Sequence, residues 1–185
     1  MENLNAKISN TLKLLRKEKN WSLDKASQKT GVSKAMLGQI ERAESSPTIS
    51  TFWKIASGFD VSFSSFVEDL DTQPEKTMHA ISKFKQVHPH DNKIHIMTLF
   101  PYDQKLGFEV FIIKLLPGCE HLSPSHQSGV VEHVAVSCEE IEVLINGTWQ
   151  NLKENEGLRF NADQPHGYRN ITGKKAIFYD MIHYK

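Results

Sequence analysis

The feature that most constrains the fold is a pair of short amphipathic segments within residues 21–42, which meet at a glycine. Ser22 and Ser33 stand immediately before the two segments, where their hydroxyl groups can accept hydrogen bonds from the free N–H groups of a first helical turn. Gly31 can supply the left-handed backbone of a sharp turn, and Val32 is expected to fill the corner between the helices. The pattern predicts a helix-turn-helix, whose second helix projects from the domain.

The second helix is expected to have one buried and one exposed face. Met36, Leu37 and Ile40 recur at helical spacing and form the expected buried side. The other face and the neighbouring helix ends hold the residues expected to contact DNA: Ser22, Ser33, Lys34, Ala35, Gly38, Gln39, Arg42, Ser45, Ser46 and Thr48. Gln39 is the best candidate for reading a base edge, since its amide can pair bidentately with adenine. A helical hairpin that binds another protein is the alternative interpretation.

Apolar residues recur at helical spacing throughout residues 5–67, and turn signals divide this stretch into short helices. One such signal, Gly58, is expected to end the fourth helix. The sequence therefore predicts a compact all-α domain of five helices. Residues 1–67 carry 10 Lys and Arg against 6 Asp and Glu, while the remainder of the chain carries 12 against 16. A basic first third on a chain without net charge is typical of a domain that meets phosphate.

Residues 68–93 are polar and weakly periodic, as expected of a linker. After them, short β-rich runs separated by turns predict the following strands: Ile94–Phe100, Phe108–Leu116, Glu132–Cys138, Glu140–Ile145, Thr148–Leu152, Gly157–Phe160 and Ala176–His183. Asn146-Gly147 is the strongest hairpin signal, because both residues tolerate a positive φ. Short strands without interleaved helices predict a β-sandwich or β-barrel over residues 94–185. The fold class is thus α + β, with two domains.

Composition agrees with an ordinary soluble globular protein, since 39% of the residues are hydrophobic and 24% are charged. The chain has no apolar run of about 18 residues, and its first residues lack the basic and apolar regions of a signal peptide. We therefore expect a cytoplasmic protein without a membrane span. Cys119 and Cys138 lack C-x-x-C spacing, so free thiols are expected rather than a disulfide or a zinc knuckle.

Residues 21–42, followed by Ser46-Pro47-Thr48, resemble the Cro/phage-repressor (XRE) helix-turn-helix family, and the resemblance covers residues 8–66. It implies a five-helix, lambda-repressor-like domain that binds palindromic operators as a homodimer. One position departs from the family pattern. Many members carry Gln as the first residue of the second helix, where it contacts DNA, whereas this chain has Leu23. The resemblance therefore does not extend to that contact.

The second part of the chain resembles the two sequence motifs of a cupin, a jelly-roll β-barrel that often holds a metal ion. Aligned to those motifs, His126, Glu132 and His166 take ligand positions. Two imidazoles and a carboxylate can hold one divalent metal ion, either zinc, iron, manganese or nickel. Ser128 stands where a second His is usual, so one expected ligand is missing.

Further positions also depart from the cupin motifs. Asn155 stands where the second motif usually has Gly, and Glu139 stands where a Gly usually ends the first motif. His121 and His133 lie outside the pattern and are expected to be exposed to solvent. The alternative to a metal site is that the polar residues of the motifs line the mouth of the barrel.

Regulators that combine this helix-turn-helix with a C-terminal cupin form a bacterial class in which the cupin senses a small effector. Within the class, Ser33–Arg42, Leu99–Asp103, Gly129–Val134 and Ile182–Tyr184 are similar to enterobacterial regulators of sulfur utilisation. The resemblance implies an effector-controlled, DNA-binding transcriptional regulator and not an enzyme, with a sulfur compound or an amino acid as effector. A metal-dependent cupin enzyme joined to a DNA-binding domain is the alternative, and an antitoxin-like protein-binding module is a third.

Overall fold

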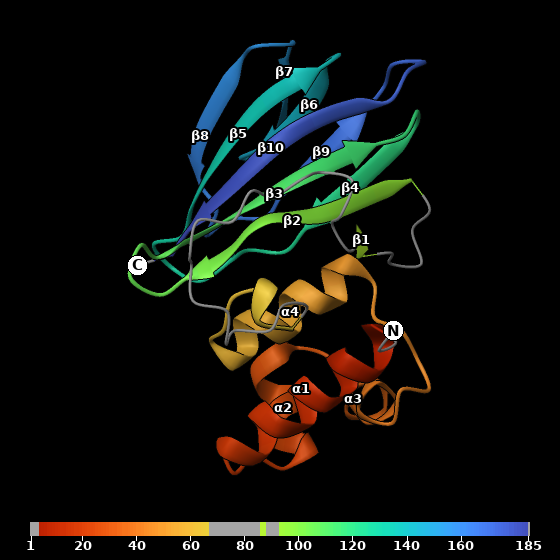
Figure 1. Cartoon of the computed structure of the whole chain (residues 1–185), viewed down its shortest axis with the longest axis vertical. Helices are drawn as coiled ribbons and strands as arrows, with labels where there is room; N and C mark the ends of the chain where they lie inside the picture. The colour runs from red at the N-terminus through yellow and green to blue at the C-terminus, as the bar shows by residue number, and fades with distance from the viewer. Residues whose placement is uncertain (1–3, 67–85, 88–92, 185) are drawn as a thin grey trace. The chain divides into compact units, whose positions relative to one another are not determined.

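The computed structural model describes residues 4–66, 86–87 and 93–184 (Figure 1). The chain divides into two compact units, the first ending at Gln73 and the second beginning at Pro74. Most of the linker predicted over 68–93 lies outside the described residues, so the domain bounds 5–67 and 94–185 stay predictions. None of the helices in the described part of the chain is both long and apolar enough to cross a membrane.

The first unit is helical, and its elements begin and end where the sequence supplies caps. Its described elements are α1 (Leu4–Glu18), α2 (Leu23–Thr30), α3 (Lys34–Glu41), α4 (Ile49–Phe59) and the 3-10 turn η1 (Ser64–Phe66). Ser22 Oγ accepts a hydrogen bond from the backbone N–H of Lys25 at 3.1 Å. Ser33 Oγ accepts one from the backbone N–H of Met36 at 3.2 Å. With Gly31 ending α2 at a φ of 65°, the predicted helix-turn-helix of α2 and α3 is confirmed.

Residues 4–66 hold four α-helices rather than the predicted five. In place of a fifth helix the chain forms the single turn η1. The rings of Phe63 and Phe66 are fully buried and pack on Phe52, with ring centroids 4.5 and 5.0 Å away. The segment therefore buries its apolar side chains within one short turn and does not need a longer helix to do so.

Gly58 has a packing role rather than the predicted role of ending the fourth helix. Helix α4 continues past it to Phe59, and Asp60 forms the left-handed cap at a φ of 64°. A Cβ atom at position 58 would lie 2.6 Å from Thr30 Cα and 2.8 Å from the carbonyl oxygen of Lys29. Because these distances are too short for a carbon atom, only glycine lets α2 and α4 approach this closely.

The second unit is a sandwich of two antiparallel sheets (Figure 1). The larger sheet has the order β1 (Gln86–Val87), β2 (Ile94–Asp103), β3 (Phe108–Leu115), β10 (Ala176–His183), β5 (Val131–Cys138) and β8 (Gly157–Asn161). The smaller sheet has the order β4 (Cys119–Ser123), β9 (His166–Asn170), β6 (Ile141–Ile145) and β7 (Thr148–Leu152). The rings of Tyr168 on β9 and Phe178 on β10 pack 5.0 Å apart, so the inner faces of the two sheets share one core.

The β-sandwich prediction is confirmed, and the closed barrel is wrong. Within residues 93–184 the strands form two separate sheets, and no hydrogen-bonded strand pair joins them. The predicted strands are confirmed to within three residues at either end, and β1, β4 and β9 are additional. Asn146 and Gly147 connect β6 to β7 with φ values of 51° and 76°, as predicted. Glu139 and Asn155 adopt φ values of 63° and 66°, so they keep the left-handed backbone at positions where cupin motifs usually have Gly.

Candidate functional site

The exposed side of α3 carries short polar and small side chains on a firmly packed helix. Lys34, Ala35 and Gln39 are exposed, as predicted. On the opposite side, Leu37 and Ile40 are 0% and 1% exposed. The helix therefore presents a narrow face of the kind that fits a DNA major groove.

Hydroxyl groups stand at the N-termini of three helices in the first unit. Ser22, Ser33 and Thr48 are the exposed N-caps of α2, α3 and α4. Ser45 and Ser46, in the loop before α4, are half-buried. Helix N-termini favour negative charge, since their first N–H groups are not used within the helix. The predicted phosphate contacts are thus placed where an anion can be stabilised.

Two cations on this side of the unit are paired with carboxylates. Lys34 Nζ lies 2.8 Å from Asp24 Oδ2 on α2. Arg42 donates through Nε and Nη2 to the two carboxylate oxygens of Glu44 at 2.8 and 2.7 Å. These hydrogen bonds lower the pKa of Glu44, so the carboxylate stays ionised. Sequence reasoning missed Asp24 and Glu44, because the number of charges does not show which of them meet.

Gly38 is buried, so the prediction that it lies on the exposed face of α3 is wrong. A Cβ atom at this position would lie 3.2 Å from Arg42 Nη1 and 3.8 Å from Leu23 Cδ1. The Leu23 side chain and the Arg42 guanidinium therefore lie across the backbone of Gly38. At the first position of α2, an apolar side chain beside α3 thus stands where the family pattern often has Gln.

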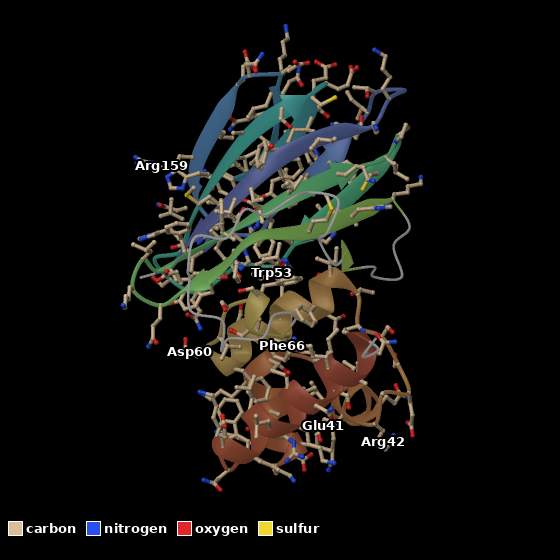
Figure 2. The ribbon with its side chains drawn as sticks, in the orientation of Figure 1. Glu41, Arg42, Trp53, Asp60, Phe66 and Arg159 are labelled. Carbon is tan, nitrogen blue, oxygen red and sulfur yellow. The ribbon has the colours of Figure 1, made fainter. Side chains whose placement is uncertain are left out.

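An ion pair that the sequence did not predict fixes the end of α3. Arg16 Nε and Nη2 donate to the two carboxylate oxygens of Glu41 at 2.5 and 2.9 Å, and Nη1 donates to the carbonyl oxygen of Trp21 at 2.9 Å. The side chains of Arg16 and Glu41 are only 18% and 9% exposed. Figure 2 shows Glu41 and its neighbour Arg42 at the end of α3. Glu41 thus ties the helix to α1, while Arg42 stays at the surface.

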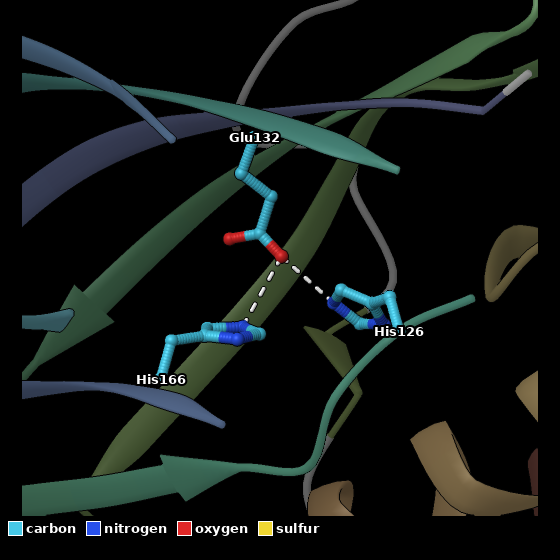
Figure 3. A group of neighbouring side chains, drawn as sticks. All are labelled: His126, Glu132 and His166. Carbon is cyan, nitrogen blue, oxygen red and sulfur yellow. Dashed lines mark ion pairs between the residues drawn. The ribbon is translucent and has the colours of Figure 1, made fainter. Parts of the chain in front are cut away.

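Three buried side chains meet inside the second unit (Figure 3). His126 lies in the loop after β4, Glu132 lies on β5, and His166 begins β9. Glu132 Oε1 is 2.7 Å from His126 Nε2 and 3.2 Å from His166 Nε2, and none of the three side chains is more than 3% exposed. The structure therefore brings together the three predicted metal ligands. Ser128, at the remaining motif position, is exposed to solvent.

The surroundings of His166 define which ring nitrogen carries a hydrogen. Nδ1 lies 2.9 Å from the carbonyl oxygen of Gln164, which can only accept, so Nδ1 is the donor. A neutral ring would then turn the Nε2 lone pair toward the Glu132 carboxylate. Burial favours the neutral ring, but the hydrogen bond and the charge of Glu132 raise the pKa of His166. Either a proton or a metal cation is therefore needed between His166 Nε2 and Glu132.

Glu132 is an ionised carboxylate with both oxygens engaged. Burial disfavours its charge, but the hydrogen bonds from His126 and His166 outweigh burial and hold the pKa of Glu132 below its ordinary value. The second oxygen accepts a short hydrogen bond from the Tyr168 hydroxyl. Burial and the charges of Asp180 and Glu132 raise the pKa of Tyr168, which keeps this hydroxyl a neutral donor.

Other buried polar groups lie near the cluster. Asp180 on β10 is buried, and its Oδ1 atom has no hydrogen-bond partner among the described residues. Burial and the charges of Glu132 and Glu109 raise the pKa of Asp180 well above its ordinary value.

His133 is exposed, as predicted. The predicted exposure of His121 is wrong, because β4 turns every second side chain into the core and His121 is one of them.

The three clustered side chains could hold one divalent transition-metal ion. Their ligating atoms all lie within 4.8 Å of one another. Two imidazole nitrogens and one carboxylate oxygen are donors that zinc, iron, manganese and nickel accept. The hydrogen bond from His166 to Gln164 is the kind of outer contact that orients a metal-bound imidazole.

The first unit is similar to a helix-turn-helix family, and the whole chain is similar to transcriptional regulators. A helix-turn-helix family model matches residues 12–66. The HTH-type transcriptional regulator SutR of Escherichia coli (strain K12) is 44% identical over 184 residues, which cover 100% of this chain and 98% of the relative. A crystal structure of an HTH_3 family transcriptional regulator from Vibrio cholerae is 44% identical, with a TM-score of 0.86 over 98% of this chain and 97% of that one.

The second unit is similar to cupin domains. The Cupin_2 domain of an XRE family transcriptional regulator from Enterobacter cloacae is 41% identical, with a TM-score of 0.50 over 50% of this chain and 98% of the domain. The crystal structure of FeII HppE is 12% identical, with a TM-score of 0.51 over 97% of this chain and 100% of that one, and it shows likeness of fold alone. The second unit is thus a cupin-like β domain. With a relative 44% identical along its whole length, the chain belongs to the HTH_3, or XRE, family of helix-turn-helix transcriptional regulators.

Proposed function

We propose that this regulator binds DNA sequence-specifically by inserting α3 into the major groove. The observation that carries the proposal is the exposed face of α3, where Lys34, Ala35 and Gln39 project from a helix that its core contacts and the Arg16–Glu41 pair hold in place. Gln39 reads a base edge, with adenine as its best partner. The N-cap hydroxyl groups of α2, α3 and α4 bind phosphate oxygens and set the register of the helix on the duplex.

DNA binding by the two paired cations requires an exchange of partners. Lys34 leaves Asp24, and Arg42 leaves Glu44, so that each can bind phosphate or guanine. Both ion pairs are exposed to water, and exposed pairs contribute little stability, so breaking them costs little free energy. The carboxylates of Asp24 and Glu44 repel the phosphates of any DNA. Only a site that binds Lys34 and Arg42 well offsets this repulsion, so the two carboxylates favour specific over non-specific sites.

One copy of α3 is too short to specify an operator. The helix has 8 residues and reaches only a few base pairs. We expect a homodimer that places two α3 helices about 34 Å apart on a palindromic operator. A regulator of this kind works on the chromosome, so the same proposal assigns the protein to the cytoplasm.

The proposal is tested by the affinity of a Gln39→Ala variant for the promoter fragment of the protein's own gene. We expect binding to weaken by about 5- to 150-fold at constant salt, since a bidentate base contact is worth about 1–3 kcal/mol. Gln150→Ala is the matched control, because Gln150 is an exposed glutamine on β7 of the other unit. Combining Gln39→Ala with Arg42→Ala should abolish the mobility shift. Equal affinities of the two glutamine variants would contradict the proposal.

The second part of the proposal is that the cupin-like domain senses a small effector at a metal ion. His126, Glu132 and His166 would hold the ion, which when bound supplies open coordination positions for a small ligand. Tyr168 fixes the second oxygen of Glu132, and Gln164 fixes the ring of His166, so the three ligands are oriented before the ion arrives. A sulfur compound or an amino acid is the effector class that the family resemblance suggests.

The metal site is tested by metal analysis of the purified protein. We expect one transition-metal ion per chain in the unmodified protein and in Glu154→Gln, which changes an exposed carboxylate. Glu132→Gln should lose the ion, because an amide cannot replace an ionised ligand between two imidazoles. Retention of the metal by Glu132→Gln, or its absence from the unmodified protein after metal-supplemented expression, would contradict this part of the proposal. Neither result bears on DNA binding by α3.

A further inference from the structure

A pocket of about 440 Å³ opens on the larger sheet, outside the His126–Glu132–His166 cluster. It is lined by Val131, His133, Arg159, Phe160, Asn161 and His183. All six residues belong to the neighbouring strands β5, β8 and β10 of one sheet. The volume lies within the range of small-molecule sites, about 300–1,000 Å³.

The register of the sheet brings three nitrogen-bearing side chains together at this pocket. His133 on β5 lies directly opposite Arg159 on β8. His183 on β10 lies opposite Val131, two residues from His133 along β5. All three side chains are exposed, and Figure 2 shows Arg159 extending from β8 away from the core. His133 and Arg159 therefore form a directly opposed pair, and His183 lies diagonal to His133, so that the three strands carry one patch of hydrogen-bond donors.

Arg159 brings a charge that no carboxylate balances within the described residues. Arg16, Arg42 and Arg169 each form an ion pair with a glutamate. Arg159 forms none within residues 4–66 and 93–184, and no acidic residue lines its pocket. A guanidinium group presents a planar fork of donors that matches the two oxygens of a carboxylate or phosphate. The donor patch of His133, Arg159 and His183 is thus chemically suited to an oxyanion.

The remaining lining residues favour an organic ligand. Val131 offers apolar surface, and the Asn161 amide can donate a further hydrogen bond. The geometry points to a site for a small organic anion, in which Arg159 binds a carboxylate or sulfonate group and Val131 contacts an apolar body. This site is separate from the metal cluster and does not depend on the proposed function.

The pocket and the buried cluster nevertheless share two structural elements. The ring of Phe160 lies 5.4 Å from the ring of His166, at an interplanar angle of 58°. Glu132 and His133 are successive residues of β5, with one side chain in the core and the other at the pocket. On β8 the Phe160 ring likewise faces the core, opposite Glu132, while Arg159 and Asn161 are exposed. The two sites therefore lie on opposite faces of the same two strands.

The proposal is tested by nuclear magnetic resonance on the full-length protein, with butyrate, propanesulfonate and inorganic phosphate as probes and chloride at matched ionic strength as reference. Butyrate or propanesulfonate should cause saturable chemical-shift changes confined to β5, β8 and β10. Arg159→Met should weaken that binding by at least about tenfold, from loss of a bidentate charge-assisted pair. Lys153→Met, which removes an exposed cation close to β8, should bind like the unmodified protein.

Three results would overturn the proposal. The first is the absence of saturable shifts with both organic anions at millimolar concentration. The second is an equal response to chloride or a response to phosphate only, which would indicate screening or an inorganic site. The third is unchanged binding by Arg159→Met. Retention of butyrate binding in Glu132→Gln would confirm that the pocket works without the metal cluster.

Discussion

The ion pair between Arg16 and Glu41 should carry a large share of the stability of the helical unit. Arg16→Met removes the guanidinium while it keeps most of the apolar stem of the side chain. The substitution breaks two hydrogen bonds to the Glu41 carboxylate, at 2.5 and 2.9 Å, and one to Trp21 O at 2.9 Å. It also leaves the carboxylate, at 9% exposure, without its cation.

The magnitude follows from burial. Removing one partner of a fully buried ion pair costs about 3–5 kcal/mol, because the other charge is left uncompensated. Water can still reach part of this pair, since Arg16 is 18% exposed. We therefore expect Arg16→Met to lower the free energy of unfolding by about 2–3 kcal/mol. For a domain of this size, such a loss lowers Tm by about 10–20 °C.

Far-ultraviolet circular dichroism during urea and thermal unfolding measures this loss, because all α-helices of the described residues lie in the first unit. Lys17→Met is the matched control, since Lys17 is the next residue of α1 and is exposed. The control should change stability by less than about 0.5 kcal/mol. If Arg16→Met is as stable as Lys17→Met, the pair does not anchor α3 and the reasoning is refuted.

Three further predictions concern other parts of the chain. Gly58→Ala should destabilise the helical unit by about 2 kcal/mol in urea unfolding, because its Cβ would overlap Thr30, whereas a gain in stability would show that α2 and α4 can separate freely. Glu44→Gln should release Arg42 for phosphate and steepen the slope of log K against log salt on random-sequence DNA by about 0.9, and an unchanged slope would contradict this. In metal-free protein, Asp180→Asn should reduce the fall in stability as the pH rises above the ordinary range of an aspartate. The reason is that burial and the charges of Glu132 and Glu109 raise the pKa of Asp180, so above that range the folded state holds a proton that the unfolded chain has released. Equal urea midpoints of both proteins at each pH would argue against a protonated Asp180.

The helix-turn-helix could be predicted because its signals are local. Ser22, Gly31 and Ser33 each act on backbone groups within a few residues, so their roles follow from the sequence alone. The position of Gly38 could not be predicted in the same way. It depends on Leu23, a residue on another helix, and helical spacing does not show which neighbour covers the edge of a face.

Two strands of the β domain, β4 and β9, could not be predicted from the sequence for a physical reason. Strands β4 and β9 turn His121, His166 and Asn170 into the core, and these polar residues break the apolar alternation that marks a strand. The motif spacing did predict that His126, Glu132 and His166 belong together. Tyr168 was missed because its bond to Glu132 joins positions 36 residues apart, and only the packing of β9 against β5 brings them together.

The central claim is that two copies of α3 read a palindromic operator through Gln39. Hydroxyl-radical footprinting of the protein on its own promoter tests this most directly. A dimer with two α3 helices should give two protected patches about one helical turn apart, roughly 34 Å, on one face of the duplex. At the lowest protein concentration that gives full protection, both patches should weaken together with Gln39→Ala and remain unchanged with Gln150→Ala. A single patch, uniform protection of the fragment, or an unchanged footprint with Gln39→Ala would contradict the account.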